Sequence, residues 1–353
     1  MNIIFSTTRQ WNPGDEFILL GCINLLRESL SAQGKDFNPV IFNRNPQIRR
    51  ARKNDLIKMI DNLLGRDFIE KFLDNSVKDR LPMDYADLVV FAGSPEWRGG
   101  RLEKLYDSIA QYNIPALFLG IGTSGRFTFD ETRFATNEME TLKNAKLITC
   151  RDQDTYESLK SLAPHHLPCP ALFSSTKERK IGSVKRIGLI YGTHDAVKNN
   201  NVSVETHRYL VTLYNHILHR YSAGYEIEFV AHYVDELSPF QKDFPGQTLR
   251  YSYDSRDYLD IFSRYDLVIG HRVHGIGMSA SLGVPGIMIA HDQRSQTVEG
   301  FLASLISVGT ELESFDRHLR EKIENIDRHN IRLLEHKALT KQRYLKLLED
   351  ADL

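Results

Sequence analysis

Histidine and arginine side chains in the second half of this 353-residue chain have the types and spacing to bind an anion or to move a proton. All 13 histidines lie at or after His165, and all but His165 and His166 are in this half, so histidine chemistry is expected from here. Four of them lie in the loops at the ends of predicted strands: His194, His232, His271 and His291. In an extended chain, residues two apart point the same way, so Arg272 and His274 would face one ligand. A guanidinium and an imidazole beside a helix start favour a phosphate or a carboxylate.

A metal cluster is the alternative function for these histidines. The sequence has no HExxH-like pair, and no Asp or Glu alternates with the histidines at the spacing of metal ligands. We therefore expect neither a metal nor a cofactor, and an anion site is the leading interpretation of His271, Arg272 and His274.

The first half of the chain offers carboxylates and glycines instead. Asn12, Gly14, Asp15 and Glu16 stand before an apolar helical segment, where glycine lets a ligand approach the backbone and the helix start offers free N–H groups. Two carboxylates would repel a phosphate, but they suit hydrogen bonds to sugar hydroxyls or proton removal from one. The alternative is an ordinary capping turn, in which the helix dipole alone favours Asp15 and Glu16.

Two more predicted strand ends carry candidate residues. One is followed by small residues, an acid and an indole: Gly93, Ser94, Glu96 and Trp97. These residues would either line a ligand or form a tight turn over a buried tryptophan. The other strand is followed by Arg151, whose guanidinium could bind a carboxylate or a phosphate through paired N–H donors. Asp152 comes next and is the predicted N-cap of a helix.

Short apolar runs that alternate with longer amphipathic runs must position these side chains. The predicted strands are Ile3–Ser6, Pro39–Phe42, Leu88–Ala92, Ala116–Leu119, Leu147–Cys150, Arg186–Tyr191, Glu226–Ala231, Leu267–Gly270 and Gly286–Ala290. The predicted helices are Glu16–Leu30, Leu102–Tyr112, Thr155–Leu162, Val204–Tyr221, Arg256–Ser263, Met278–Leu282 and a long helical region from Glu313 to the end. This alternation predicts an α/β fold with parallel sheets and crossover helices.

A polar stretch without periodicity, residues 174–183, interrupts the alternation and is the predicted linker. It divides the chain into an N-terminal domain, 1–175, and a C-terminal domain, 184–353, both doubly wound, with a cleft between them. Ligands of such sheets lie beyond the carboxyl ends of the strands, so the polar residues described above would face this cleft. The first domain would meet an acceptor with hydroxyls, and the second an anionic donor.

The composition excludes several other classes of protein. Hydrophobic residues make up 41% and charged residues 26%, and 45 Lys+Arg against 46 Asp+Glu give a net charge of −1, which argues against a nucleic-acid binder. No apolar run approaches the roughly 20 residues of a membrane span, and the N-terminus does not resemble a signal peptide. Cys22, Cys150 and Cys169 lack metal-ligand spacing and are odd in number, which indicates free thiols and a cytoplasmic location.

Taken in order, these motifs resemble the polysaccharide pyruvyl transferase family over most of the chain. The family's features are an N-x-G-D-E turn, an R-D-x-x-S motif, and R-[LV]-H-G followed by an apolar helix and G-x-P. The corresponding residues are Asn12–Glu16, Arg151-Asp152 with Thr155 in the Ser position, Arg272–Gly275 and Gly283–Pro285.

The resemblance implies two Rossmann-like domains in a GT-B-like arrangement and a transferase that acts on phosphoenolpyruvate. Such an enzyme moves the pyruvyl (enolpyruvyl-derived) group onto a sugar of a polysaccharide or of a lipid-linked glycan precursor, forming a pyruvate ketal. By this resemblance Arg272 and His274 take the phosphate, Arg151 helps hold the donor, and His274 is the acid. Asp15 or Glu96 would serve the acceptor side. The residues assigned to substrate binding are Asn12, Gly14, Gly93, Ser94, Glu96, Arg151, His194, His271 and Arg272.

The chain departs from the family pattern at three places. Cys169 stands where the family often has Asp before Pro-Ala, Gly93–Glu96 replaces a glycine run, and Arg294 replaces a common Lys. Two alternatives stay open: a GT-B glycosyltransferase that uses a nucleotide sugar, and a catalytically inactive member that acts as a binding subunit. The acceptor sugar, a homo-oligomeric state and peripheral contact with a membrane stay open as well.

Overall fold

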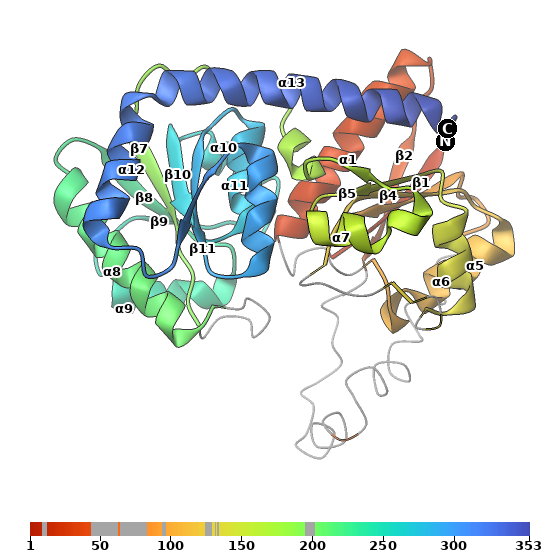
Figure 1. The fold of residues 1–353 in the computed structure, drawn as a ribbon, viewed down its shortest axis with the longest axis horizontal. Helices are drawn as coiled ribbons and strands as arrows, with labels where there is room; N and C mark the ends of the chain where they lie inside the picture. Colours follow the sequence, from red (N-terminus) through yellow and green to blue (C-terminus); the bar gives the residue numbers. More distant parts are fainter. Residues whose placement is uncertain are drawn as a thin grey trace.

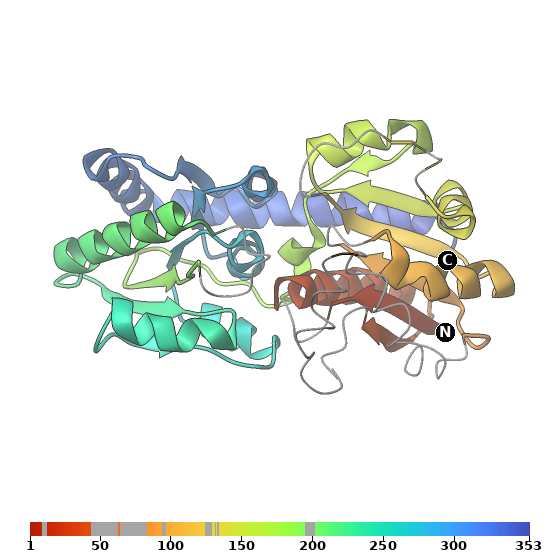
Figure 2. The same cartoon turned by 90° about the horizontal axis from the view of Figure 1, so that it is seen from below.

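Two parallel sheets of six strands each form the framework of the protein. The computed structural model describes residues 1–8, 13–43, 63, 83–93, 97–123, 129–130, 132, 134–194 and 202–353. Each sheet is flanked by helices, and the two sheets lie side by side (Figures 1 and 2). The predicted α/β class with two Rossmann-like domains is therefore confirmed, while the residue bounds proposed for the domains stay a prediction.

The first sheet has the strand order β2-β1-β3-β4-β5-β6. Its strands are β1 (Asn2–Thr7), β2 (Asn38–Asn43), β3 (Leu88–Ala92), β4 (Ala116–Ile121), β5 (Leu147–Cys150) and β6 (His165–His166). Its helices are α1 (Pro13–Ala32), α5 (Glu103–Tyr112), α6 (Thr136–Lys143) and α7 (Gln153–Ser158). β3, β4 and β5 are buried along their whole length, as parallel strands covered on both faces must be.

The second sheet has the order β12-β11-β10-β7-β8-β9. Its strands are β7 (Arg186–Ile190), β8 (Glu226–Val230), β9 (Leu249–Arg250), β10 (Leu267–Gly270), β11 (Gly286–Ala290) and β12 (Ser304–Ser307). The helices that follow are α8 (Val204–Tyr221), α9 (Leu237–Asp243), α10 (Asp257–Phe262), α11 (Val273–Ser281), α12 (Leu312–Glu324) and α13 (Ile326–Asp350). All nine predicted strands are present, whereas the helix predicted from Met278 begins five residues earlier, at Val273.

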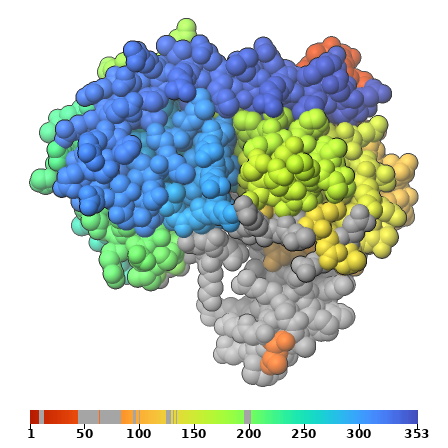
Figure 3. Space-filling view, viewed as in Figure 1, coloured from red at the N-terminus to blue at the C-terminus, as the bar shows by residue number. Residues whose placement is uncertain are grey.

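The last helix, α13, runs across both sheets (Figure 1) and covers one side of the molecule (Figure 3). Two of its buried polar side chains hold the segment between the sheets. Lys337 Nζ donates to the carbonyl oxygens of Ser175 (3.1 Å) and Ser281 (2.6 Å). Asn330 Nδ2 donates to the carbonyl oxygen of Arg179 (2.8 Å) and to that of the turn after α11 (2.7 Å). The connection is thereby fixed to α13 and to the end of α11 through its backbone.

Close packing at the junction of the two halves involves α1, α11 and the short helical turn η4 (Pro170–Phe173). A β-carbon at Gly21 of α1 would overlap the carbonyl oxygen of Pro170. A β-carbon at Gly277 of α11 would lie 2.8 Å from the Phe301 ring and 3.2 Å from Ala171 Cβ. Both glycines thus allow a helix to approach η4 closely.

The substitution Gly21→Ala tests this packing. Alanine normally stabilises a helix interior relative to glycine, but here its β-carbon meets backbone, so we expect the free energy of unfolding to fall by about 2 kcal/mol. The matched control is Gly182→Ala, where a β-carbon has open space, and the change should stay within about 0.5 kcal/mol. Denaturant unfolding followed by circular dichroism measures both, and equal stabilities would contradict the packing argument.

Candidate active site

The predicted site residues lie at the carboxyl ends of strands in both sheets. Arg151 directly follows β5, and Arg272 and His274 follow β10. Side chains from the two halves meet here: Arg151 Nη1 and His274 Nε2 are 2.9 Å apart, and the rings of Phe17 in α1 and Tyr258 in α10 lie 5.5 Å apart. The structure therefore brings the motifs of the two halves into one region.

The contact between Arg151 and His274 fixes the state of the imidazole. A guanidinium only donates hydrogen bonds, so His274 Nε2 accepts, and the proton of the neutral ring is on Nδ1. Burial lowers the pKa of His274 well below its usual range, and the charges of Arg151 and Arg294 lower it further. In the ligand-free protein His274 is thus a neutral imidazole rather than a cation.

Arg272 lies at the N-cap of α11, in extended backbone, and is almost fully buried. Its Nη2 donates to the carboxylate of Glu236, and its guanidinium lies 4.8 Å from the centre of the Tyr233 ring. Glu236 also accepts from the backbone N–H groups of His232 (2.8 Å) and Tyr233 (3.0 Å). Burial raises the pKa of Glu236, and the neighbouring guanidinium and N–H groups oppose that rise.

Arg272 and His274 do not converge in the way that the sequence suggested. The prediction assumed extended chain through both residues, but the helix α11 begins at Val273, between them. Arg272 consequently bonds Glu236 of the second half, while His274 bonds Arg151 of the first half. The two side chains hold different partners at the same helix start.

Both arginines keep an unused donor. Arg151 Nε and Arg272 Nε are buried and have no hydrogen-bond partner of nitrogen or oxygen within the described ranges. Arg151 makes no ion pair with any carboxylate that the structure describes, and it lies beside Cys169. Burial raises the pKa of the Cys169 thiol, and the guanidinium opposes part of that rise. A buried donor without a partner costs about 1–3 kcal/mol, which an incoming anion would recover.

The other two histidines of the site are also neutral. Burial lowers the pKa of His232 to about 3 and that of His271 well below its usual range, and the charge of Arg272 adds to both shifts. The His232 ring packs edge-on against Phe17, with centroids 5.9 Å apart. The His271 ring is 5.6 Å from that of His291. The positive charge of this region therefore comes from arginine, not from histidine.

The first turn of α1 places two carboxylates near the same region. Asp15 and Glu16 are both buried, and Ser255 Oγ of the second half donates to Glu16 Oε2. The charge of Asp15 raises the pKa of Cys169 and that of Tyr233, so its carboxylate lies within electrostatic range of both halves. Gly14 is buried in the same turn. This arrangement suits Asp15 for hydrogen bonds to a polar ligand held between the halves.

The remaining predicted residues have different outcomes. Gly93 has a left-handed backbone (φ +66°), and a β-carbon there would lie 2.5 Å from Ile18 of α1, so the structure explains this glycine by packing. Trp97 is fully buried, and its Nε1 donates to the Gly122 carbonyl oxygen (3.1 Å), which places the indole in the core. Three predicted residues lie outside the described ranges: Asn12, Ser94 and Glu96.

Several site residues were not predicted from the sequence. Glu236 has a detectable signal, because Tyr233-Val-Asp-Glu236 places an acid three residues after a helix N-cap. Ser255 and Tyr233 have none, since only the fold brings them to Glu16 and Arg272. The sequence likewise gives no sign that His207 contacts His194 or that Asp243 contacts His207.

No metal centre accompanies this site in the part of the chain that is described. Among those residues, no group of three His, Cys, Asp or Glu side chains is arranged to hold a metal ion. A search of the same residues finds no helix with the length and apolar character needed to cross a bilayer.

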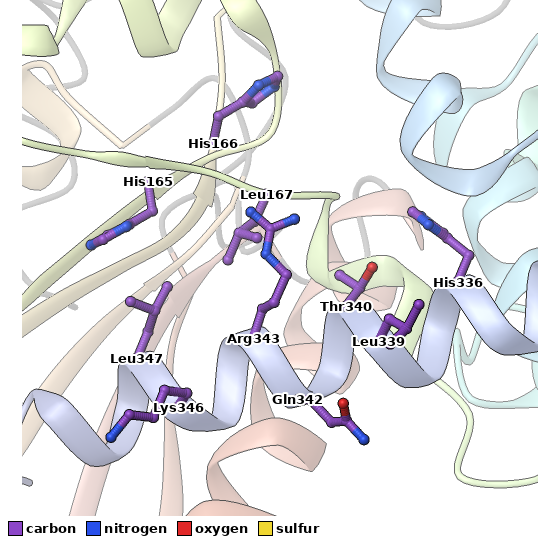
Figure 4. Close-up of a pocket in the computed structure, with 10 residues that line it drawn as sticks. All are labelled: His165, His166, Leu167, His336, Leu339, Thr340, Gln342, Arg343, Lys346 and Leu347. Carbon is purple, nitrogen blue, oxygen red and sulfur yellow. The ribbon is translucent and has the colours of Figure 1, made fainter.

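An open groove of about 730 Å³ lies elsewhere, between the edge strand β6 and α13 (Figure 4). The residues that line it are His165, His166, Leu167, His336, Leu339, Thr340, Gln342, Arg343, Lys346 and Leu347. None of the predicted site residues is among them. This groove is therefore separate from the region around Arg151 and Arg272.

Comparisons with known proteins agree with this fold and these motifs. The model of the family described as polysaccharide pyruvyl transferase matches residues 12–293. The chain has no match among curated protein sequences.

Solved structures resemble the whole chain. One is UDP-GlcNAc 2-epimerase from Neisseria meningitidis bound to UDP-GlcNAc, with 13% identity, a TM-score of 0.52 and coverage of 94% of each chain. Another is a putative UDP-N-acetylglucosamine 2-epimerase from Listeria monocytogenes, with 11% identity, a TM-score of 0.55, and coverage of 93% of this chain and 89% of that chain. At these identities the likeness shows the fold.

Substitution of Glu236 tests the buried ion pair with Arg272. Glu236→Ala leaves a buried guanidinium without its carboxylate, so we expect the free energy of unfolding to fall by about 3–5 kcal/mol. Glu236→Gln is the matched control, because its amide oxygen still accepts from the N–H groups of His232 and Tyr233, and its cost should be smaller. Denaturant unfolding measures both, and a loss below about 1 kcal/mol for the alanine variant would contradict the pairing.

Proposed function

The chain belongs to the polysaccharide pyruvyl transferase family, a family of transferases, and we propose that its donor is phosphoenolpyruvate. In this proposal the enolpyruvyl-derived group moves to a sugar of a polysaccharide or a lipid-linked glycan precursor and becomes a pyruvate ketal. We place the protein in the cytoplasm, where its three buried cysteines would stay reduced.

The observation that carries the proposal is the pair of arginines with unused donors. Phosphoenolpyruvate has a phosphate and a carboxylate, so it needs two cationic anchors. Arg151 comes from the first half and Arg272 from the second, and each has a buried Nε without a nitrogen or oxygen partner in the described structure. A guanidinium matches both anions through paired N–H donors. We assign the phosphate to Arg272 beside the start of α11, where free backbone N–H groups add donors, and the carboxylate to Arg151.

Neutral histidines around the arginines fit this role. Each added cation would strengthen binding of product phosphate as well as of donor, whereas a neutral imidazole can take up a proton when the anion arrives. His274 is the nearest candidate, because it already contacts Arg151. A bound dianion would raise the pKa of His274, so the ring would gain a proton on donor binding and could give it to the methylene carbon of the donor.

The acceptor side of the proposal rests on Asp15. Its buried carboxylate lies in the first turn of α1, within electrostatic range of Cys169 and Tyr233. We propose that it takes the proton of the sugar hydroxyl that attacks C2 of the donor. Gly14, His194 and His271 stay proposed as substrate contacts, together with Asn12, Gly93, Ser94 and Glu96.

Titration calorimetry with phosphoenolpyruvate tests donor binding. We expect Arg151→Gln to raise the dissociation constant by about 10–100-fold, because it removes one charge-assisted hydrogen-bonding group. Arg332→Gln, on the exposed side of α13, is the control and should bind normally. Arg272→Ala is the poorer variant, since it leaves Glu236 buried without its cation.

The same titration separates the alternatives. Absence of phosphoenolpyruvate binding at millimolar concentration would contradict the proposal. Binding of UDP-GlcNAc in its place would favour a nucleotide-sugar transferase, an alternative suggested by the ligand of the Neisseria relative. Binding of phosphoenolpyruvate without phosphate release, across a panel of methyl hexosides, would favour a binding subunit.

Proton uptake tests the role of His274. Since its pKa is well below 6.5 in the free protein, the ring is neutral at pH 7.5, and donor binding should draw up to one proton from the buffer. Calorimetry in buffers of different ionisation enthalpy measures this uptake. The difference between the unmodified protein and His274→Gln isolates the histidine from the donor's own phosphate, and equal uptake by both would exclude His274 as the group that is protonated.

A further inference from the structure

Two glycines, Gly122 and Gly192, lie against the arginines of the proposed donor site. Gly122 directly follows β4, and β4 is hydrogen-bonded to β5, the strand that Arg151 follows. Gly192 comes two residues after β7, and β7 is hydrogen-bonded to β10, the strand that ends two residues before Arg272. Each glycine therefore stands at the carboxyl end of the strand that adjoins the strand of an arginine.

Lack of space, rather than backbone conformation, explains Gly122. Its φ is not positive, so an alanine could adopt the same backbone. A β-carbon at this position would, however, lie 2.6 Å from Arg151 Nε and 2.5 Å from Asp152 Oδ2. Nonbonded heavy atoms pack about 3.5–4.0 Å apart, so the side chains of Arg151 and Asp152 would have to move.

Gly192 makes a similar contact in the second sheet. Its φ is not positive either. A β-carbon there would overlap the ring of His271 and lie 3.3 Å from Arg272 Nη2. The His271 side chain is buried among packed neighbours, which limits how far its ring can move. An added β-carbon would thus crowd Arg272 both directly and through His271.

Each guanidinium is held between a glycine and a polar partner. Arg151 is 5% exposed, and its Nη1 contacts His274 Nε2 at 2.9 Å. The side chain of Arg272 is 10% exposed, and its Nη2 donates to Glu236. In both arginines Nε is buried and has no nitrogen or oxygen partner among the described residues. Displacement of either side chain would consequently move a donor that a ligand can use.

Gly188 of β7 shows how a close-packed glycine of the core differs. A β-carbon at Gly188 would lie 2.6 Å from the ring of Tyr265, which is fully buried. The overlap is as severe as at Gly122, but the neighbour is a core side chain. At Gly122 and Gly192 the nearest side chains include the two arginines to which we assign the donor.

We propose, on the basis of the proposed function, that Gly122 and Gly192 are positioning residues for the two anion anchors of the donor. Gly122 sets Arg151 for the carboxylate, and Gly192 sets Arg272 for the phosphate. The carboxylate and the phosphate oxygen of phosphoenolpyruvate are both attached to C2, so the two anchors need a fixed spacing. Hydrogen bonds weaken steeply when the donor loses its alignment, so a shift of one guanidinium reduces binding.

Inorganic phosphate separates the roles of the two glycines, because it has no carboxylate. It would use the anchor at Arg272 but not the anchor at Arg151. A change at Gly122 should therefore affect the binding of phosphoenolpyruvate alone, whereas a change at Gly192 should affect the binding of both anions.

Calorimetry with phosphoenolpyruvate and ³¹P line broadening with inorganic phosphate measure the two dissociation constants. We expect Gly122→Ala to raise the constant for phosphoenolpyruvate by about 10-fold and to leave that for phosphate within about twofold. Gly192→Ala should raise both constants by about 10-fold. Gly188→Ala is the matched control, since its overlap is with the core: it should lower the free energy of unfolding and leave both constants within about twofold.

A variant of Arg151 shows whether Gly122 acts through the guanidinium. Arg151→Lys keeps the positive charge but has a methylene group in place of Nε. Alone it should raise the dissociation constant of phosphoenolpyruvate by about 10-fold, and the addition of Gly122→Ala should change this constant by less than about twofold. The comparison also serves if Gly122→Ala alone does not fold, because a flexible lysine can move away from the β-carbon.

The possible results separate the positioning role from the proposed function. Normal binding of phosphoenolpyruvate by Gly122→Ala and Gly192→Ala would overturn the positioning role and leave the proposed function intact. Three results would overturn the assignment of the anchors: equal loss of both anions in Gly122→Ala, a further large loss when it is added to Arg151→Lys, or no phosphate binding by the unmodified protein. Failure of the unmodified protein to bind phosphoenolpyruvate would contradict the proposed function itself.

Discussion

The hydrogen bond between Arg151 and His274 joins the carboxyl edge of one sheet to that of the other, and the chemistry of the site depends on it. It holds a permanent cation against an imidazole that burial keeps neutral. Arg151 is only partly paired, because its Nε has no nitrogen or oxygen partner within the described structure and it forms no ion pair with a carboxylate there. In the proposed function the anionic donor would supply the missing partner.

The rest of the fold serves to keep these two edges in contact. α13 fixes the connection between the sheets through Lys337 and Asn330, and α1 and α11 pack on η4 without β-carbons at Gly21 and Gly277. The start of α1 brings Asp15 to the junction, and the start of α11 brings Arg272 and His274. Helix starts that meet at a junction add their N–H dipoles to the arginine charge, which favours an anion over a cation there.

The sequence predicted the strands because parallel strands buried on both faces are short continuous apolar runs. It missed β6, β9 and β12. β6 and β9 are two residues long and too short for any periodicity. It placed the start of α11 too late, because Gly275 and Gly277 resemble helix breakers, whereas here they allow close packing against Ile190 and Phe301. The positions of helices and strands can be predicted from local sequence patterns. The glycines that close packing requires cannot, because their neighbours are distant in the sequence.

The candidate site was predictable only in part, for a related reason. Arg151 directly follows a strand, and Arg272 and His274 lie within four residues of the end of another, so parallel topology places them on the carboxyl edges. Their states depend on the fold: Glu236 neutralises Arg272, and burial together with the charge of Arg151 lowers the pKa of His274. The excess of histidine in the second half suggested cations, yet the buried rings of His232 and His271 carry none.

The division of labour between arginine and histidine follows from this electrostatic arrangement. Fixed cations can hold an anionic donor, but they cannot supply protons, since a guanidinium does not lose its own. Neutral histidines can supply them only where something nearby stabilises the added proton. For His274 that partner would be the bound anion, so protonation and donor binding are coupled.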